Sequence, residues 1–168
     1  MVDQLLFGFN DNKKKMATLS LFEQANNGTI YFNEICDLPI ETQAKLINVI
    51  QEQSFYKFGS NQKIKIDIRV IAGTTYDPIE AIKEGVLKED LYYRLSVVPI
   101  NIPSLNSRIE DINILINSFM EIASKIFNKN NLIFSNETYI LLQTFDWKGN
   151  VRQLKNLIEW LLIMYGNE

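Results

Sequence analysis

Strand-like and helix-like segments alternate along the chain up to Pro103, and only helical patterns follow. A short apolar run covers residues 30–35, and residues 63–72 alternate at period two before becoming fully apolar. Between these runs, apolar residues from Ile40 to Ile50 recur at helical spacing. A run this short and this apolar is typical of a strand buried on both faces of a parallel sheet. We therefore predict an α/β fold in which a helix connects parallel strands.

The helix between the two strands has a start signal in the sequence. Asp37 is expected to cap its N-terminus, and Pro39 falls in the first turn, where the missing N–H has no cost. Its polar residues Gln43, Lys45 and Glu52 are predicted to lie on the surface.

The remaining elements follow from similar signals. A short helix is predicted over residues 77–84, and a third strand is predicted over residues 97–102, where Pro99 favours a strand start or an edge. Helices are then expected from Arg108, after Ser135 and over residues 151–165. Residues 9–15 are predicted to form a loop or a frayed start. We therefore predict an α/β domain over 1–103 and a helical domain over 104–168.

Composition excludes several classes of protein. The chain has no histidine and one cysteine, Cys36, which almost excludes a zinc site or a histidine-based triad and rules out an intrachain disulfide. The net charge of −3 excludes a polybasic nucleic-acid tail. No apolar run approaches the roughly 18–20 residues that a membrane span needs. We expect a soluble protein of a reducing compartment, located in the cytoplasm, with no membrane partner.

Two polar side chains end the first predicted strand. Asn33 and Glu34 fall at its carboxyl end, which is the edge where open α/β sheets bind ligands. An acid at this edge can orient an attacking water or hold a Mg²⁺-bound water. A polar residue at a strand end is more often part of a turn or a helix cap, so both interpretations stay open on this evidence alone.

Six segments in order carry a resemblance to a known family. They are residues 28–35 (GTIYFNEI), 37–46 (with DLP and QAKL), 69–72 (RVIA), 89–95 (EDLYYRL), 98–100 (VPI) and 147–156 (WKGNVRQLKN). The set resembles the AAA+ ATPase module of sigma-54-dependent transcription activators, the bacterial enhancer-binding proteins of the response-regulator type. The resemblance covers residues 21–164. It implies a partial P-loop-type parallel sheet followed by a small helical lid, with ATP and Mg²⁺ as ligands.

The resemblance also implies roles for individual residues. Glu34 matches the water-polarising acid of the Walker B strand, and Asn33 stands where the family has an aspartate associated with magnesium. Thr75 falls at the sensor I asparagine, and Lys88 and Arg94 fall at two arginines that act across the subunit interface. In the lid, Arg152 matches sensor II. Arg108 matches an arginine of the linker into the lid, and Asn106 stands where the family has the partner of that arginine.

Three of these positions depart from the family pattern. Asn33 is neutral, so it should support Mg²⁺ and the developing phosphoryl charge poorly. The hydroxyl of Thr75 has a shorter reach than an amide and cannot reproduce its paired donor and acceptor. Lys88 keeps the charge of arginine but loses the planar fork that matches phosphate oxygens. We therefore expect ATP hydrolysis to be weak or absent.

Two family motifs are absent from the sequence. There is no Gly-x-x-x-x-Gly-Lys-[Ser/Thr] phosphate loop, which in the family precedes the region that residues 5–8 match. The sigma-factor contact loop, Gly-Ala-Phe-Thr-Gly-Ala, is expected between Gly8 and Phe22 and is not present there. The resemblance thus implies an N-terminally truncated module that lacks the Walker A strand. We expect a gap in its sheet and marginal stability.

The leading functional hypothesis is a fragment of a sigma-54 interaction ATPase. The intact family assembles as a homo-oligomeric ring, couples ATP hydrolysis to activation of sigma-54 RNA polymerase, and contacts DNA through a domain absent from these 168 residues. One alternative is a binding module that docks on intact activators through Arg94. Another is the remnant of a split or decaying gene.

Overall fold

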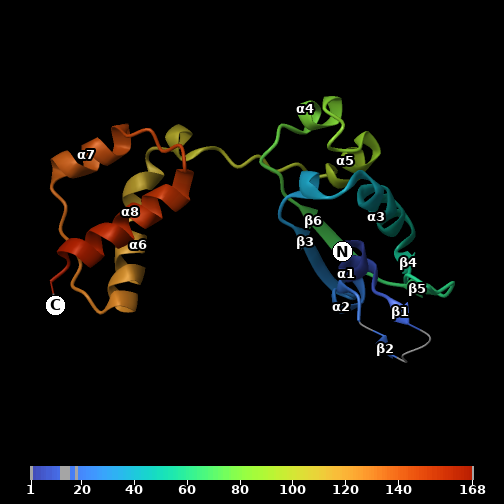
Figure 1. Ribbon diagram of the computed structural model, residues 1–168. Helices are drawn as coiled ribbons and strands as arrows, with labels where there is room; N and C mark the ends of the chain where they lie inside the picture. Colours follow the sequence, from blue (N-terminus) through green and yellow to red (C-terminus); the bar gives the residue numbers. More distant parts are fainter. Residues whose placement is uncertain (1, 12–15, 18, 168) are drawn as a thin grey trace. The chain divides into compact units, whose positions relative to one another are not determined.

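The computed structural model describes residues 2–11, 16–17 and 19–167 of the chain (Figure 1). The chain divides into two compact units, Met1–Pro99 and Ile100–Glu168. The first unit contains α1 (Val2–Phe7), β1 (Asn10–Asp11), β2 (Met16–Ala17), α2 (Leu21–Gln24), β3 (Gly28–Phe32), the 3₁₀ turn η1 (Ile35–Asp37), α3 (Ile40–Glu52), β4 (Ser54–Tyr56), β5 (Lys63–Lys65), β6 (Ile68–Ala72), α4 (Pro78–Lys83) and α5 (Glu89–Leu95). The second contains the 3₁₀ turn η2 (Leu105–Ser107), α6 (Asp111–Phe127), α7 (Asn136–Thr144) and α8 (Asn150–Tyr165).

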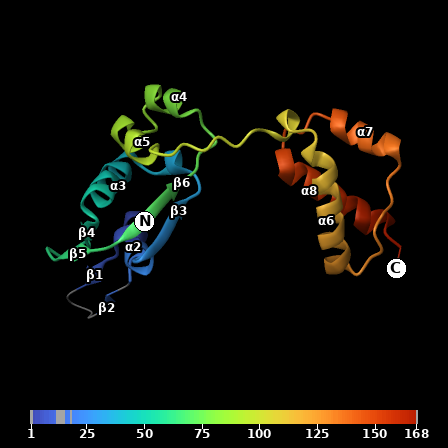
Figure 2. The ribbon, with the colours of Figure 1, turned by 180° about the vertical axis from the view of Figure 1, so that it is seen from behind.

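The predicted strand–helix–strand unit is confirmed. Strands β3 and β6 pair in parallel, with Gly28 opposite Ile68 and Phe32 opposite Ala72. Figures 1 and 2 show the two strands side by side and pointing the same way. Helix α3 lies between them in the sequence and contacts α5. The carboxyl ends of both strands therefore meet at one edge of the sheet.

The predicted strand over 63–72 is divided in two. Strand β5 pairs antiparallel with β4, whereas β6 pairs with β3. The change occurs at Asp67, whose N–H donates to Asn26 Oδ1 (2.8 Å) and whose C=O accepts from Asn27 N (2.7 Å). Because these bonds use the backbone of Asp67, the ladder cannot continue through it.

The predicted third strand over 97–102 is wrong. Within the described residues, no strand pairs with this segment, and its four aliphatic side chains, Val97, Val98, Ile100 and Ile102, are 75–83% exposed. A strand needs a hydrogen-bonded neighbour, and Pro99 and Pro103 have no N–H to offer one. Val97 and Val98 lie in the turn that follows α5, and residues 99–102 have no regular secondary structure.

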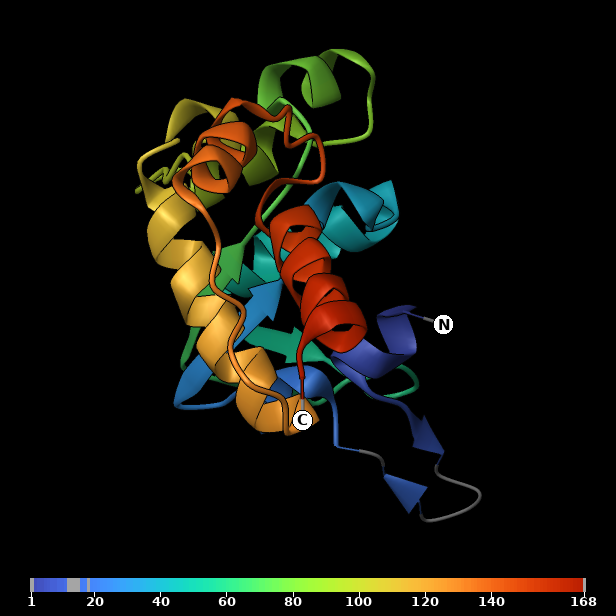
Figure 3. The same ribbon diagram turned by 90° about the vertical axis from the view of Figure 1, so that its left-hand side faces the viewer.

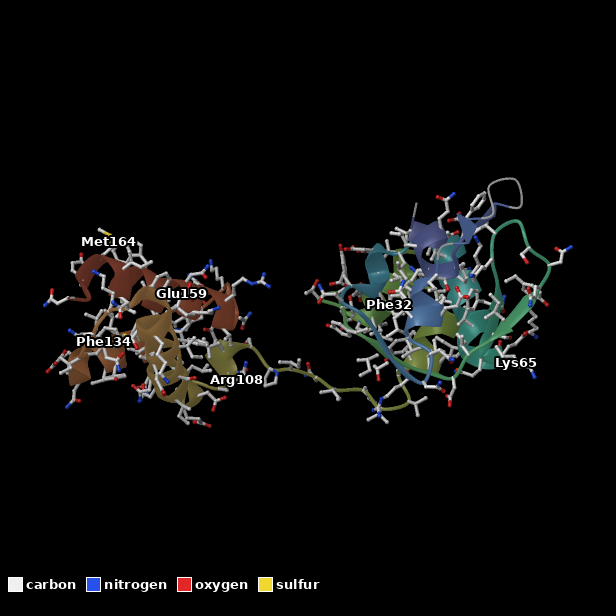
Figure 4. The ribbon with its side chains drawn as sticks, turned by 90° about the horizontal axis from the view of Figure 1, so that it is seen from below. Phe32, Lys65, Arg108, Phe134, Glu159 and Met164 are labelled. Atoms are coloured by element: carbon white, nitrogen blue, oxygen red, sulfur yellow. The ribbon has the colours of Figure 1, made fainter. Side chains whose placement is uncertain are left out.

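The core of the first unit is aromatic and aliphatic. Phe22 is fully buried, and its ring lies 5.3 Å from that of Phe7 and 5.6 Å from that of Phe55 (centroid distances). Leu46 of α3 and Leu91 of α5 are also fully buried. In Figure 4, Phe32 lies within this unit, and Lys65 lies at its outer edge. This core fixes the helices that flank the sheet edge.

Two predicted helix starts have different outcomes. Asp77 caps α4, because its side chain accepts hydrogen bonds from Ile79 N and Glu80 N. Asp37 does not cap α3, because it lies in the 3₁₀ turn η1, and the cap residue is Pro39, without a side-chain hydrogen bond. The loop predicted over 9–15 contains β1, which pairs with β2 just after the loop, and its residues 12–15 lie outside the described part.

The second unit is entirely helical, as predicted. Helices α6 and α8 pack against each other, and Figures 2 and 3 show them side by side. Their contact residues are fully or almost fully buried: Ile112, Ile116, Leu154, Ile158 and Leu162. The predicted core residue Trp147 is 1% exposed, and its indole N–H donates to Leu142 O (2.8 Å). No helix in the described residues is long and apolar enough to cross a membrane.

Candidate functional site

The ends of β3 and β6 bring together residues that are far apart in the sequence. The N–H of Gly73 donates to Phe32 O (2.8 Å), and the N–H of Ile35 donates to Gly73 O (3.0 Å). These two bonds extend the pairing past the last residue of β3. They place Glu34 beside Thr75, as the predicted sheet edge requires.

Thr75 holds one oxygen of the Glu34 carboxylate. Glu34 Oε2 accepts hydrogen bonds from Thr75 N (2.8 Å) and from Thr75 Oγ1 (2.9 Å). The other oxygen, Oε1, is buried and has no hydrogen-bond partner among the described residues. Because Oε1 has almost no solvent-exposed surface here, a water could donate to this unsatisfied oxygen only after the groups around it move.

The pKa of Glu34 is lowered from its ordinary value. Partial burial acts in the opposite direction, because it disfavours the charged form, but the nearby Thr74 hydroxyl, which itself donates to Cys36 Sγ (3.3 Å), and the hydrogen bonds from Thr75 together prevail. Glu34 is thus ionised at neutral pH. An ionised carboxylate is the form that can orient a water and accept its proton.

Asn33 lies next to Glu34 and is exposed. Its Oδ1 accepts a hydrogen bond from the hydroxyl of Tyr31 (3.3 Å). At the neighbouring Gly73, an added Cβ would lie 3.1 Å from the backbone oxygen of Asn33 and 2.9 Å from the hydroxyl of Tyr31, the end of an exposed side chain. The two strand ends therefore approach closely, and a larger residue would need the backbone of Asn33 to shift by a few tenths of an ångström.

Asn33 and Glu34 do not fit a magnesium site by themselves. The pair offers one carboxylate, and its Oε2 is already engaged by Thr75. No group of three or more His, Cys, Asp or Glu that could hold a metal exists in the part of the chain that the structure describes. Because Mg²⁺ depends on carboxylates and substrate phosphates, we derive no step through a metal held by these two residues.

The two predicted trans-acting cations lie at opposite ends of α5. Lys88 is the half-buried N-cap residue, and Arg94 is exposed in the last turn. Six residues of helix separate them by about 9 Å along the axis. Neither side chain has a hydrogen bond or ion pair within the described residues. Among the described residues, Arg94 is therefore an unpaired cation on the surface of the first unit.

The remaining predicted residues belong to the second unit. Arg152 lies exposed in the first turn of α8. Arg108, labelled in Figure 4, lies 3.6 Å from Asp111 (Nη1 to Oδ2). Asn106 binds the loop before α8, because its Nδ2 donates to Asp146 Oδ1 (2.6 Å) and its Oδ1 accepts from Trp147 N (2.9 Å). Thus Asn106, near the start of this unit, is hydrogen-bonded to the loop that precedes α8 and Arg152.

Sequence reasoning missed one buried polar residue. Gln43 is predicted to lie on the surface, but it is 0% exposed and hydrogen-bonds the backbone before α5. The physical reason is that α5 covers this side of α3, so both faces of the helix are covered there. Helical periodicity carries no signal for such a residue, because it assigns polar side chains to solvent.

The sequence matches two families. The Sigma-54 interaction domain matches residues 1–101, and the AAA+ ATPase lid domain matches residues 106–168. This chain belongs to the sigma-54 interaction domain family. The predicted family is therefore confirmed, together with its α/β fold and its helical lid.

Relatives of this sigma-54 interaction domain are transcription regulators. It is 39% identical over 163 residues to the nitrogen assimilation regulatory protein NtrX of Azorhizobium caulinodans, covering 97% of the chain and 36% of the relative. It is 41% identical over 144 residues to the regulatory protein AtoC of Escherichia coli, covering 86% and 31%. The chain thus spans about a third of the length of the curated relatives it matches.

Solved structures of NtrX from Brucella abortus share the fold. One superposes with a TM-score of 0.90 at 33% identity, over 99% of this chain and 38% of that one. Another, in complex with ADP, gives 0.87 at 35% identity, over 96% and 36%.

Proposed function

We propose that this chain is the part of a sigma-54 activator ATPase that orients the attacking water and contacts the nucleotide of a neighbouring subunit, with weak or no ATP turnover of its own. The Glu34–Thr75 contact is the observation that carries this proposal. One carboxylate oxygen is fixed by two hydrogen bonds, and the other has no donor in the described residues.

Glu34 supplies the water-orienting part of the chemistry. The lowered pKa keeps the carboxylate charged at neutral pH, and the Thr75 bonds restrict its rotation. Once movement of the surrounding groups lets a water reach the buried Oε1, that water would lose a proton toward this oxygen as it attacks the terminal phosphate. The fixed geometry removes the need to reorient the base during the reaction.

Three departures from the family pattern make turnover weak. Asn33 brings no negative charge to a magnesium-bound phosphate, and the exposed Thr75 hydroxyl is committed to Glu34. Lys88 can neutralise a phosphate as a point charge, but it cannot form the bidentate pair that an arginine forms. Each departure weakens the stabilisation of charge on the transferring phosphate, which is usually the largest contribution to the catalysis of phosphoryl transfer.

Arg94 is the group offered to a neighbouring subunit. It is exposed, and it has no ion pair in the described residues, so no internal carboxylate competes for its charge. Arginine suits this task because its guanidinium matches phosphate oxygens in a bidentate manner. The proposal includes a ring of subunits in the cytoplasm, with sigma-54 RNA polymerase as the target and ATP with Mg²⁺ as the substrate.

The test replaces the matching segment of an intact activator, such as AtoC, with this chain and measures ATP turnover of the hybrid. We expect turnover at least about tenfold below that of the intact activator, because one lost charge contact to a transferring phosphate has such an effect. Asn33→Asp should raise turnover, and Glu34→Gln should abolish what remains.

A matched control separates the site from charge in general. Asn27→Asp makes the same change at the other end of β3, where Asn27 has a positive φ of 59° that aspartate tolerates. This variant should leave turnover unchanged. Full turnover of the hybrid, or sustained turnover by the chain alone that Glu34→Gln abolishes, would contradict the proposal of weak catalysis.

The free Arg94 also favours a second candidate function. A chain with an unpaired arginine on an exposed helix can bind an intact activator and modulate it without hydrolysing ATP. The test is binding of the purified chain to a full-length activator. Binding that persists in Arg94→Ala would exclude this candidate.

A further inference from the structure

Gln43 joins two backbone segments that carry site residues. Its side-chain Nε2 donates to Leu38 O (2.9 Å) and to Val86 O (2.8 Å), and its Oε1 accepts from Lys88 N (2.9 Å). The residue is 0% exposed. The buried amide therefore hydrogen-bonds backbone groups of two loops, through its two N–H hydrogens and its oxygen.

The first of these segments follows Glu34 directly. The 3₁₀ turn η1 begins at Ile35, and the N–H of Leu38 donates to Ile35 O (3.3 Å). Gln43 binds the carbonyl of Leu38, which ends this turn. The amide therefore fixes the path of the chain just after the water-orienting carboxylate.

The second segment begins α5. Lys88 is the N-cap residue of this helix, its side chain makes no capping bond, and its carbonyl accepts the first helical bond from Tyr92 N (3.1 Å). Gln43 binds the N–H of this same residue. Since α5 has seven residues and carries Arg94 in its last turn, a change at its N-cap would move both cations.

The surroundings leave the amide without a substitute. Leu46, Leu87 and Leu91 are 0–4% exposed and belong to the same core, so water does not replace a lost hydrogen bond readily. At this side-chain length, only an amide offers both a donor for Val86 O and an acceptor for Lys88 N. A carboxylate would face two carbonyls, and a thioether would leave the N–H unpaired.

We propose that Gln43 is a positioning residue that sets Lys88 and Arg94 relative to Glu34. It connects the turn after the carboxylate to the start of the helix that bears the cations. This inference rests on the proposed function for the role of the cations, whereas the connection itself is a property of the chain alone.

The experiment compares hydrogen–deuterium exchange in the purified chain and in two matched variants, below their unfolding temperatures. Gln43→Met removes the amide at nearly constant volume. Gln53→Met is the control, because the Oε1 of Gln53 also accepts a backbone hydrogen bond, from Ile68 N (3.0 Å), at a site on the sheet. We expect exchange to rise about tenfold or more in peptides over 35–39 and 86–95 in Gln43→Met only.

Two exchange results would overturn the inference. One is equal acceleration of all peptides, which would make Gln43 an ordinary core residue, and the other is unchanged exchange in either of the two peptides. Binding to a full-length activator provides a second readout, in which Gln43→Met should weaken binding and add nothing to Arg94→Ala. Additive losses would also overturn the positioning role.

This design separates the two proposals. If Arg94→Ala binds the activator as the unchanged chain does, the role given to the cations is wrong. Exchange in the two peptides then still decides whether Gln43 connects the turn after Glu34 to α5.

Discussion

Thr75→Val should weaken the Glu34 carboxylate contact without changing the volume of the site. The side chain of valine has the shape of threonine, so only the hydrogen bond from Thr75 Oγ1 to Glu34 Oε2 (2.9 Å) is lost, and the bond from Thr75 N (2.8 Å) remains. Loss of one hydrogen bond costs about 0.5–1.5 kcal/mol. We expect a decrease of this size in the free energy of unfolding at pH 7.

The pH dependence of this decrease follows from the direction of the pKa shift. The pKa of Glu34 in the folded chain lies below its ordinary value of 4.5, so its ionised form stabilises the fold above that value. This contribution is lost as the pH falls through the lowered pKa of the folded state. The difference between the unchanged chain and Thr75→Val should therefore be largest near neutral pH and shrink in acid.

The assay is urea unfolding at a series of pH values, with Thr144→Val as the control. Thr144 Oγ1 donates to the carbonyls of Ile140 and Leu141, which do not titrate, so the effect of this substitution should not vary with pH. A decrease in Thr75→Val that is equally independent of pH would refute the reasoning. It would show that the hydroxyl does not stabilise the charged form of Glu34.

Two further predictions concern the fold. Leu91→Ala should lower the free energy of unfolding by about 2–5 kcal/mol in denaturant unfolding, because Leu91 is fully buried where α5 meets the core, and a loss under about 1 kcal/mol would contradict that packing. Because no described strand pairs with the apolar segment 97–102, the chain should bind an apolar fluorescent dye there and unfold over a broad thermal transition, and Ile100→Lys should reduce the dye signal. A sharp transition without dye binding would contradict the expectation of a marginal fragment.

Periodicity and turn signals were sufficient for the parts of the fold that depend on local sequence. The parallel β3–β6 pair, the Asp77 cap and the helical second unit follow from short-range patterns. The segment 97–102 has the composition of a strand, but composition cannot supply a neighbour, and no described strand pairs with it. The interruption at Asp67 also depends on a distant partner, Asn26.

The residues of the candidate site also differ in whether the sequence alone identifies them. Glu34 was identifiable from its place at a strand end, and Thr75 from the family resemblance, and parallel pairing then places the two strand ends together. Gln43 was not identifiable, because its role depends on contact between α3 and α5, which are separated by 36 residues of sequence. Buried polar residues within helices are therefore the class of site residue that pattern reading misses.

The departures from the family pattern fall where the fold tolerates them. Asn33 and Thr75 are exposed, and Lys88 is half-buried. The buried Gln43 differs from them, because all of its hydrogen bonds are to backbone groups of the chain. Substitutions at exposed residues that have no cap or short hydrogen bond to lose, as at Asn33, usually change stability by less than about 0.5 kcal/mol. Asn33→Asp should therefore leave the free energy of unfolding nearly unchanged. Any gain in turnover of a hybrid activator that carries it would then report restored charge at the sheet edge and not a better-folded chain.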